Sequence, residues 1–593
     1  MHSNIFDNLN EQQAEAVRHA EGPSIILAGA GSGKTRVLTM KVLYLIKDKG
    51  IDPSHIIMMT FTNKAAGEMT KRVGFTLGFI GTFHSFCAAA LRRYGRHVGL
   101  NSNFLIYDED DTESLLKNII KDVNSPKKIT PSYVKHKISS AKDNLIEPSE
   151  YIKFSDTQQD EIIAKIYLEY QKRLEKNNAV DFDDLIFKGV ALFRDNPSVL
   201  KKYNDMFRYI LVDEFQDTNA GQYMLARYLA RGNNNITVVG DFSQSIYSWR
   251  GADIKNLERF QRDFKGAKVF YLQENYRSTQ NVLDFAYNII NHNETHPILE
   301  LFTKNDQGDD VLIQELENEE AEGVFVAEEI TRLMQKAKLS EVAVLYRINA
   351  QSRAIEEVFL HYGIPYVLIG GTRFYERKEI KDLLSYIRLI VNPSDEISLE
   401  RVHKIGKKRF EQFKVFFKEI KNEKDQYTTD ELIKMTLDST GYFLLYDEND
   451  PQDFARLENI KELRSVAVRF PNVHEFLQQV ALVESEYSES EKSKKNKNGV
   501  RMMTLHQAKG LEFPYVFIIG VEEGLLPHSR SLYDLHELEE ERRLLYVGIT
   551  RAEKKLYLTH AQRRFMFGRR MYSQVSRFID KNDNGEDTYI KTF

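Results

Sequence analysis

Residues 24–38 read "SIILAGAGSGKTRVL" and carry the strongest local signal in the chain. Ser24–Ala28 is a short apolar run, which predicts a buried strand, and a glycine-rich turn follows it. A helix is expected to begin near Lys34. Strand, glycine-rich loop and helix in this order are the setting that a phosphate-binding P-loop requires. The stretch therefore predicts a nucleotide-binding site, with an ordinary glycine-rich turn as the alternative.

The residues of this loop have distinct predicted roles. Its three glycines allow backbone amides to converge on phosphate oxygens, and the start of the helix adds the positive end of its dipole. Lys34 is expected to neutralise the β- and γ-phosphates, and the Thr35 hydroxyl to bind Mg²⁺. Ala28 stands where the strict pattern has its first glycine. The predicted phosphate loop comprises Ala28, Gly29, Ala30, Gly31, Ser32, Gly33, Lys34 and Thr35.

A matching pair of acids lies far downstream, in "FRYILVDEFQDTN" at residues 207–219. Tyr209–Val212 predicts a second buried strand, and Asp213 and Glu214 follow it directly. Asp213 is expected to hold Mg²⁺ together with Thr35, and Glu214 to orient and deprotonate the attacking water. Acidic pairs are common on protein surfaces, so the strand before this pair and the P-loop upstream are what make it informative.

Phosphoryl transfer also needs positive charge near the γ-phosphate. Two arginines in turn-like contexts are candidates, Arg277 in "ENYRS" and Arg551 in "GITRA". Both lie far from the P-loop in sequence, which fits a contribution from a second domain. The alternative for each is a solvated surface arginine.

The bulk composition sets the class of protein. The chain has 593 residues, 42% of them hydrophobic and 28% charged, which predicts several domains of a globular protein, about three to five. No run approaches the ~20 apolar residues of a membrane span, and the N-terminus has no secretory signal pattern. A cytoplasmic location without membrane partners is therefore expected. The net charge of -5 does not exclude a local basic groove for nucleic acid.

The cysteine content also fits a cytoplasmic location. Cys87 is the only cysteine, so the chain has no intrachain disulfide and a cysteine-based metal site is disfavoured. We expect Cys87 to be a small packed side chain, and a reducing compartment fits this usage.

Ten motifs in a fixed order run from residue 9 to residue 552, and together they resemble the UvrD/Rep/PcrA-type superfamily 1 DNA helicases. They are "LNEQQAEAV", "AGAGSGKTR", "TFTNKAAGEM", "TFHS", "DFDDL", "VDEFQDTN", "GDFSQSIYSWRGAD", "ENYRS", "TLHQAKGLEF" and "EERRLLYVGITRA". The resemblance covers nearly the whole chain.

The resemblance implies an α/β fold with two RecA-like P-loop motor domains, each a parallel sheet flanked by helices and interrupted by a mainly helical insertion. We expect the first motor domain at residues 1–87 and 186–268, with its insertion at 88–185. The second motor domain is expected at 269–370 and 500–593. Its insertion, at 371–499, looks shortened and has a charged, low-complexity end at 484–499 that is expected to be a flexible connection.

The resemblance also implies nucleotide-binding roles. Gln13 is expected to read adenine, with Arg36 nearby and Tyr276 stacking on the base. Gln244 resembles a sensor of the γ-phosphate that couples it to the DNA track. The remaining assignments are two arginine fingers and a glutamate that contacts the nucleotide, at Arg277, Arg551 and Glu512.

Single-stranded nucleic acid is held by aromatic faces that stack on bases and by polar groups on phosphates. Each aromatic residue near the motifs, taken alone, is more often part of a core. As a set they resemble the family's base-stacking residues. The expected DNA-binding residues are Phe61, Thr82, His84, Phe182, Tyr247, Trp249, His506 and Phe567. Trp249 is the only tryptophan, and its neighbours in "GDFSQSIYSWRGA" are polar.

Three features depart from the family pattern. The region "VHKIGKKRFEQF", residues 402–413, stands where relatives carry a Gly-Ile-Gly hairpin that touches duplex. Its basic residues are expected either to meet backbone phosphates or to form a basic surface turn: Lys404, Lys407, Lys408 and Arg409. Phe242 and Ser243 stand where relatives often have a second acid, and the chain ends soon after "SRFI".

Three functions are compared on this basis. The first is an ATP- and Mg²⁺-dependent translocase that moves 3′ to 5′ on single-stranded DNA, binds single-strand/duplex junctions and unwinds duplex in DNA repair or replication, with unknown protein partners. The second is a translocase that mainly displaces proteins from DNA. The third, a non-catalytic DNA-binding scaffold, is disfavoured by the intact Lys34, Asp213, Glu214, Arg277 and Arg551.

Overall fold

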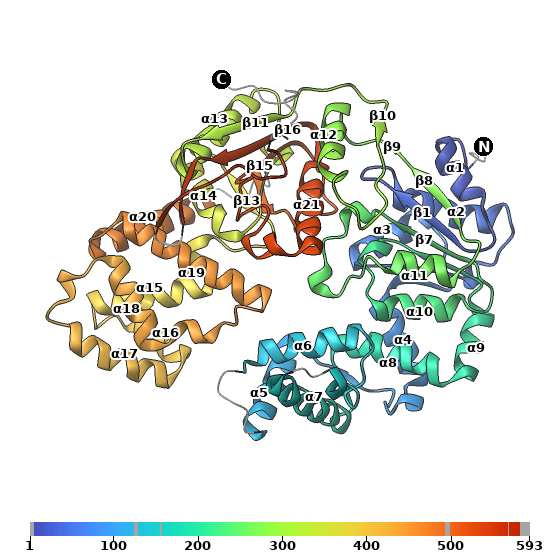
Figure 1. The fold of residues 1–593 in the computed structure, drawn as a ribbon, viewed down its shortest axis with the longest axis horizontal. Coiled ribbons are helices and arrows are strands. Elements are labelled where there is room, and N and C mark those ends of the chain that lie inside the picture. Colours follow the sequence, from blue (N-terminus) through green and yellow to red (C-terminus); the bar gives the residue numbers. More distant parts are fainter. Residues whose placement is uncertain (1–4, 124–128, 155–156, 493–497, 567–568, 581–593) are drawn as a thin grey trace. The chain divides into compact units, whose positions relative to one another are not determined.

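The computed structural model describes residues 5–123, 129–154, 157–492, 498–566 and 569–580. The chain divides into two compact units, each described here by itself. The first comprises Met1–Arg277 with Ile290–Asn305, and the second comprises Ser278–Ile289 with Asp306–Phe593. Each unit contains one six-stranded parallel sheet with helices packed against it, as Figure 1 shows. The expected α/β class with parallel sheets is confirmed.

The first sheet has the strand order β3-β2-β6-β7-β1-β8, and all its neighbours pair in parallel. The two strands predicted from apolar runs are present as β1 (Ser24–Ala28) and β6 (Tyr209–Val212), and both are buried throughout. Such continuous apolar runs are typical of parallel strands that are covered on both faces. The other strands are β2 (Ile56–Thr60), β3 (Phe79–Thr82), β7 (Ile236–Gly240) and β8 (Lys268–Leu272).

Side-chain alternation along β1 divides the packing between two apolar clusters. Ile25 and Leu27 join one cluster together with Phe215 of the loop after β6. Ile26 and Ala28 join the other, with residues from α1 (Glu11–Arg18) and α2 (Lys34–Lys47). Because successive strand side chains point to opposite faces, this one strand is fixed from both sides. The P-loop that follows it therefore starts from a rigid position.

The edge strand β8 bears on the expected domain boundary. It pairs with β1 from Ser24↔Lys268 to Ala28↔Leu272. The first sheet therefore extends beyond residue 268, where we expected the first motor domain to end. A short strand pair, β9 (Glu274–Asn275) with β10 (Phe302–Thr303), follows it within the same unit.

The helical patterns between "TFHS" and "VDEF" are present as helices. The expected helical insertion contains α5 (Glu109–Asp122) and α7 (Gln158–Lys176), and α6 (Pro131–Asp143) lies between them. These three helices share a small apolar cluster that includes Leu116, Ile138 and Tyr167. The unit's other helices are α3 (Asn63–Val73), α4 (Phe83–Tyr94), α8 (Phe182–Asp195), α9 (Pro197–Met206), α10 (Ala220–Ala230) and α11 (Asn256–Asp263). Cys87 is fully buried in α4, as expected of a packed side chain.

The second sheet has the order β11-β16-β15-β12-β14-β13, again entirely parallel. Its strands are β11 (Leu312–Leu316), β12 (Val342–Tyr346), β13 (Tyr366–Leu368), β14 (Val500–Thr504), β15 (Phe513–Ile518) and β16 (Ala552–Ala561). The helices close to it in sequence are α13 (Glu319–Leu333), α14 (Ser352–His361) and α21 (Leu535–Ile549), and α12 (Gln280–Ile290) precedes β10.

Among the described residues between β13 and β14 there are six α-helices: α15 (Lys378–Val391), α16 (Glu396–Ile405), α17 (Lys407–Ile420), α18 (Thr429–Thr440), α19 (Pro451–Arg469) and α20 (Val473–Lys492). A single apolar cluster runs from the sheet, at Val344 and Val500, into these helices at Leu383 and Phe476. Because α20 continues to Lys492, the beginning of the 484–499 segment is helical rather than an irregular connection. Residues 493–497 lie outside the described residues.

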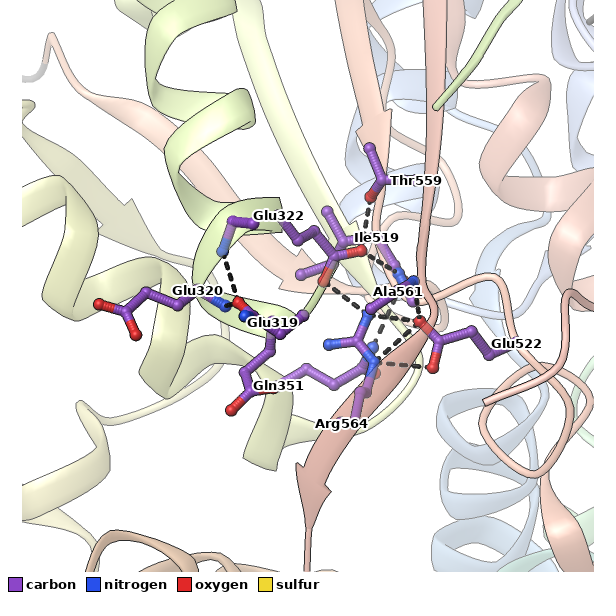
Figure 2. A network of polar contacts seen from close by, with 12 residues as sticks. Glu319, Glu320, Glu322, Gln351, Ile519, Glu522, Thr559, Ala561 and Arg564 are labelled. Atoms are coloured by element: carbon purple, nitrogen blue, oxygen red, sulfur yellow. Dashed lines mark hydrogen bonds and ion pairs between the residues drawn. The ribbon is translucent and has the colours of Figure 1, made fainter. Parts of the chain in front are cut away.

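A buried charged network joins three segments of the second unit. Arg564, in β17 (Arg563–Met566), makes ion pairs with Glu322 at 2.6 Å and with Glu522 at 2.7 Å. Thr559 Oγ1 and the Gly520 amide also donate to Glu322. Figure 2 shows the Arg564 guanidinium directed at both carboxylates. Both glutamates are 1% exposed, so Arg564 is the counter-ion for two carboxylates that are buried away from solvent.

Arg564→Met is expected to lower the free energy of unfolding by about 3–5 kcal/mol, because it leaves two buried carboxylates without their cation. The matched control is Arg577→Met. Arg577 pairs with Glu523, the residue next to Glu522, but its side chain is 46% exposed, so its loss should cost under about 1 kcal/mol. Urea unfolding followed by circular dichroism compares the two variants. Equal losses would contradict the assigned role of the network.

The described residues contain no helix that combines the length and the apolar character needed to cross a membrane.

Candidate nucleotide site and aromatic surface

The phosphate loop has the backbone conformation that its glycines allow. Gly31 (φ 64°) and Gly33 (φ 82°) are left-handed, a conformation that costs other residues free energy. Gly33 is the N-cap of α2, and no side chain caps this helix in the described structure. The first amides of α2 point to the phosphate loop, where the helix dipole favours negative charge. A Cβ on Gly29 would collide with Leu301, so close packing also requires glycine at this position.

Asp213 lies beside the start of α2, as predicted. Thr35 Oγ1 donates to Asp213 Oδ2 at 3.1 Å. Burial and the neighbouring Glu214 raise the pKa of Asp213 to about 7. A hydroxyl and one carboxylate, completed by phosphate oxygens and water, suit Mg²⁺. Among the described residues no group of three His, Cys, Asp or Glu side chains is placed to hold a metal ion.

Glu214 is held in an unusual backbone conformation. Its φ of 50° and ψ of 44° are left-handed, which costs a residue other than glycine about 1–3 kcal/mol. Its carboxylate lies 3.7 Å from Lys34 Nζ, and the side chain is 30% exposed. The strained turn therefore directs a partly solvated carboxylate at Lys34, the lysine that is predicted to bind phosphate. This is the position that a base for the attacking water requires.

Gln216 links Glu214 to the segment that holds Gln244, and the sequence reasoning missed it. Gln216 Nε2 donates to Glu214 Oε2 at 2.6 Å, while its Oε1 accepts from the Asp241 amide at 3.0 Å. Gln244 Nε2 in turn donates to Asp241 Oδ2 at 2.6 Å. Glu214, Gln216, Asp241 and Gln244 thus form one chain of hydrogen bonds. The sequence shows Gln216 only as one of several polar residues in "VDEFQDTN". It does not show that this side chain is buried, so its bridging role could not be predicted.

The residues expected to bind the base are grouped near the P-loop. Gln13 Nε2 donates to the Ser32 carbonyl at 2.9 Å, and the Tyr276 amide donates to the Gly31 carbonyl at 3.0 Å. Tyr276 is 47% exposed, so its ring is accessible to a base. Asn10, which the sequence reasoning did not single out, donates to the Tyr276 hydroxyl at 2.8 Å.

The two predicted basic partners of the nucleotide in this unit also lie at the loop. A Cβ on Gly31 would come within 2.9 Å of Arg277 Cβ. The backbone there is held by Asn275, whose Oδ1 accepts from the Arg277 amide at 2.8 Å and whose Nδ2 donates to the Ala30 carbonyl at 2.7 Å. Arg36 lies in the first turn of α2, with its Cβ 3.8 Å from the Cβ position of Gly33.

The second unit holds the other predicted nucleotide residues. Arg551 is 2% exposed, and its guanidinium donates to the carbonyls of Val547 at 2.9 Å and Leu511 at 3.1 Å. The Phe513 amide donates to the Arg551 carbonyl, which brings Glu512 and Arg551 close together where β15 and β16 begin. The predicted nucleotide residues therefore fall into two groups, one in each unit.

Five of the predicted DNA-binding aromatic residues form two stacks in the first unit. Phe61 and Tyr247 are parallel with ring centroids 6.1 Å apart, and Trp249 meets Tyr247 edge-on at 6.4 Å. His84 stacks on Phe182 at 4.3 Å. Phe182 is 57% and Trp249 is 40% exposed, which is unusual for large apolar side chains. Burial lowers the pKa of His84 to about 4, so its ring is neutral and resembles an aromatic hydrocarbon face at pH 7.

The three remaining predicted DNA contacts have different surroundings. Thr82 is the N-cap of α4, where its hydroxyl accepts from the Ser85 amide at 3.2 Å. His506 follows β14 in the second unit and is half-buried. Phe567 lies outside the described residues.

Comparison with known proteins agrees with these motifs. The UvrD/REP helicase N-terminal domain matches residues 9–265, and the UvrD-like helicase C-terminal domain matches residues 270–436 and 404–563. The chain is 43% identical to a protein of Bacillus subtilis (strain 168) named ATP-dependent DNA helicase PcrA, over 97% of this chain and 86% of that protein. Proteins with the same name from Staphylococcus epidermidis (40%; 97% and 86%) and Leuconostoc citreum (39%; 97% and 85%) are also similar. The chain belongs to the UvrD-like helicase family.

Proposed function

We propose that this chain is an ATP-dependent translocase that moves 3′ to 5′ on single-stranded DNA and unwinds the duplex at a junction. One observation carries the proposal: the chain of hydrogen bonds from Glu214 through Gln216 and Asp241 ends at Gln244, five residues before Trp249. A nucleotide-binding group and a base-stacking group thus share one short segment. The polarity is carried over from the family resemblance alone.

The P-loop residues and the acids have complementary roles in hydrolysis. Lys34 and the first amides of α2 bind the phosphates, while Gln13 and Tyr276 hold the base. Glu214 accepts the proton of the attacking water. Thr35 and Asp213 would hold Mg²⁺, which would supply charge that stabilises the transferring phosphoryl group. Arg277 is assigned remaining positive charge at the γ-phosphate, and for Arg551 the same role is carried over from the family resemblance alone.

The coupling step follows from the hydrogen bonds of Gln244. Gln244 Nε2 donates to Asp241 Oδ2 at 2.6 Å. A γ-phosphate competes for this amide, so binding and hydrolysis change the restraint on the segment that leads to Tyr247 and Trp249. Because stacking accepts any base, movement along the strand needs no particular sequence. Each hydrolysis event is thereby linked to one change in how Tyr247 and Trp249 contact the bases of single-stranded DNA.

Strand separation on tailed duplexes tests the proposal. With ATP and Mg²⁺, a duplex with a 3′ single-stranded tail is expected to be unwound, and the same duplex with a 5′ tail is not. Lys34→Ala is the control, because it removes the phosphate-binding cation. Preference for the 5′ tail would overturn the polarity. DNA-stimulated ATP hydrolysis that releases streptavidin from a biotinylated strand, without strand separation, would favour the protein-displacing alternative.

A further inference from the structure

The two aromatic stacks of the first unit are carried by separate elements. Phe182 is the first residue of α8, and Trp249 lies in a short 3-10 turn, Ser248–Arg250, after β7. A strand of DNA that stacks on both requires a fixed distance between them. The last two residues of α6, Lys142 and Asp143, contact the supports of both stacks.

Lys142 fixes the beginning of α8. Its ammonium group has no exposed surface and lies 2.6 Å from Asp181 Oδ2 and 2.9 Å from Asp184 Oδ1. Asp181 is the N-cap of α8, where its Oδ1 accepts from the Asp184 amide at 2.8 Å. Tyr170 also donates to Asp181, at 2.9 Å. Phe182 therefore follows a residue whose carboxylate is held from three directions.

Asp143 supports the segment that carries Trp249. Its Oδ1 accepts from Asn219 Nδ2 at 2.5 Å, and Asn219 is the N-cap of α10. A Cβ on Gly251 would collide with Asp143 Oδ2, so the carboxyl group packs directly against the turn that ends two residues after Trp249. Burial and the nearby Asp183 raise the pKa of Asp143 to about 8. The carboxyl group is therefore mostly neutral at pH 7, and asparagine is its closest substitute.

We infer that Lys142 and Asp143 are positioning residues for single-stranded DNA, which hold the Phe182 and Trp249 stacks at one separation. The inference rests on the proposed function, because it needs DNA to occupy both stacks. Neither residue touches the nucleotide site described above. Adjacent positions at one helix end make the separation insensitive to motion of the rest of α6, since both contacts move together.

Asp143 substitutions in the full chain test the inference, with oligo-dT as the probe and the single tryptophan as the reporter. Asp143→Ala is expected to weaken oligo-dT binding about tenfold, the order expected when one base loses its stacking partner, and to reduce the quenching of Trp249 emission. Asp143→Asn should restore both to within about twofold. Asp143→Glu adds a methylene group against Gly251 and should weaken quenching like the alanine variant. ATP hydrolysis without DNA should be unchanged in all three.

The possible outcomes distinguish a failure of the positioning role from a failure of the proposed function. Wild-type affinity and quenching in both Asp143→Ala and Asp143→Glu would overturn the positioning role and leave the proposed function intact. Equal losses in Asp143→Asn and Asp143→Ala, with normal ATP hydrolysis without DNA, would also overturn it, because a neutral isostere should suffice. An absence of quenching by oligo-dT in the wild-type chain would overturn the stacking assignment of Trp249, and the positioning role with it.

Discussion

Glu214→Gln is expected to lower the rate of ATP hydrolysis by about a thousandfold while ATP binding is retained. Removal of a general base costs roughly 10² to 10⁴ in rate. Glutamine has the same shape, can still accept the hydrogen bond from Gln216, and is no more strained than glutamate in the left-handed backbone at this position. The stability of the fold should therefore not change, and the loss should be confined to proton transfer.

Steady-state hydrolysis with and without oligo-dT, together with binding of a fluorescent ATP analogue, measures this effect. Glu258→Gln is the matched control, because Glu258 is an exposed residue of α11 in the same unit. A Glu214→Gln variant that keeps more than about a tenth of the wild-type rate would contradict the role of Glu214 as the base.

Lys34→Ala should weaken ATP binding by about a hundredfold and abolish unwinding. The Lys34 side chain is 12% exposed, and its Nζ lies 3.7 Å from the Glu214 carboxylate, so its charge lies beside the predicted catalytic acid. Hydrogen bonds to charged groups contribute about 1.5–3 kcal/mol each, and two such bonds to phosphate account for this loss. In contrast to Glu214→Gln, the defect appears in binding as well as in hydrolysis.

Titration of a fluorescent ATP analogue and strand separation on a 3′-tailed duplex check the Lys34 prediction. Lys47→Ala is the control, since Lys47 is an exposed lysine at the other end of the same helix. ATP-dependent unwinding that survives in Lys34→Ala would contradict the assignment of this loop as the motor's nucleotide site.

The strands and the loop that were predicted correctly are those that a short stretch of sequence specifies by itself. The apolar run 24–28 and the glycines that follow it contain all the information needed for β1, the loop and the start of α2. The same is true of β6 and its two acids. The structure adds that β7 lies between β6 and β1, an order that depends on contacts between distant segments. No local pattern predicts strand order.

The residues that sequence reasoning missed share a physical cause. Gln216, Asn10 and Asn275 act through amide hydrogen bonds to groups that are distant in sequence or buried. Polar residues in loops are common, and only the folded chain distinguishes one that bridges two functional segments from one that faces water. The Arg564 network was missed for the same reason, because its two glutamates come from α13 and from the loop after β15.

The different cores of the two helical insertions determine how far the effect of a core substitution extends. Helices α5, α6 and α7 have an apolar cluster of their own, whereas α15 to α20 share one continuous cluster with the second sheet. A substitution in the core of the first insertion should therefore destabilise mainly its own three helices. A substitution in the core of the second insertion should also weaken the packing of the sheet that it shares.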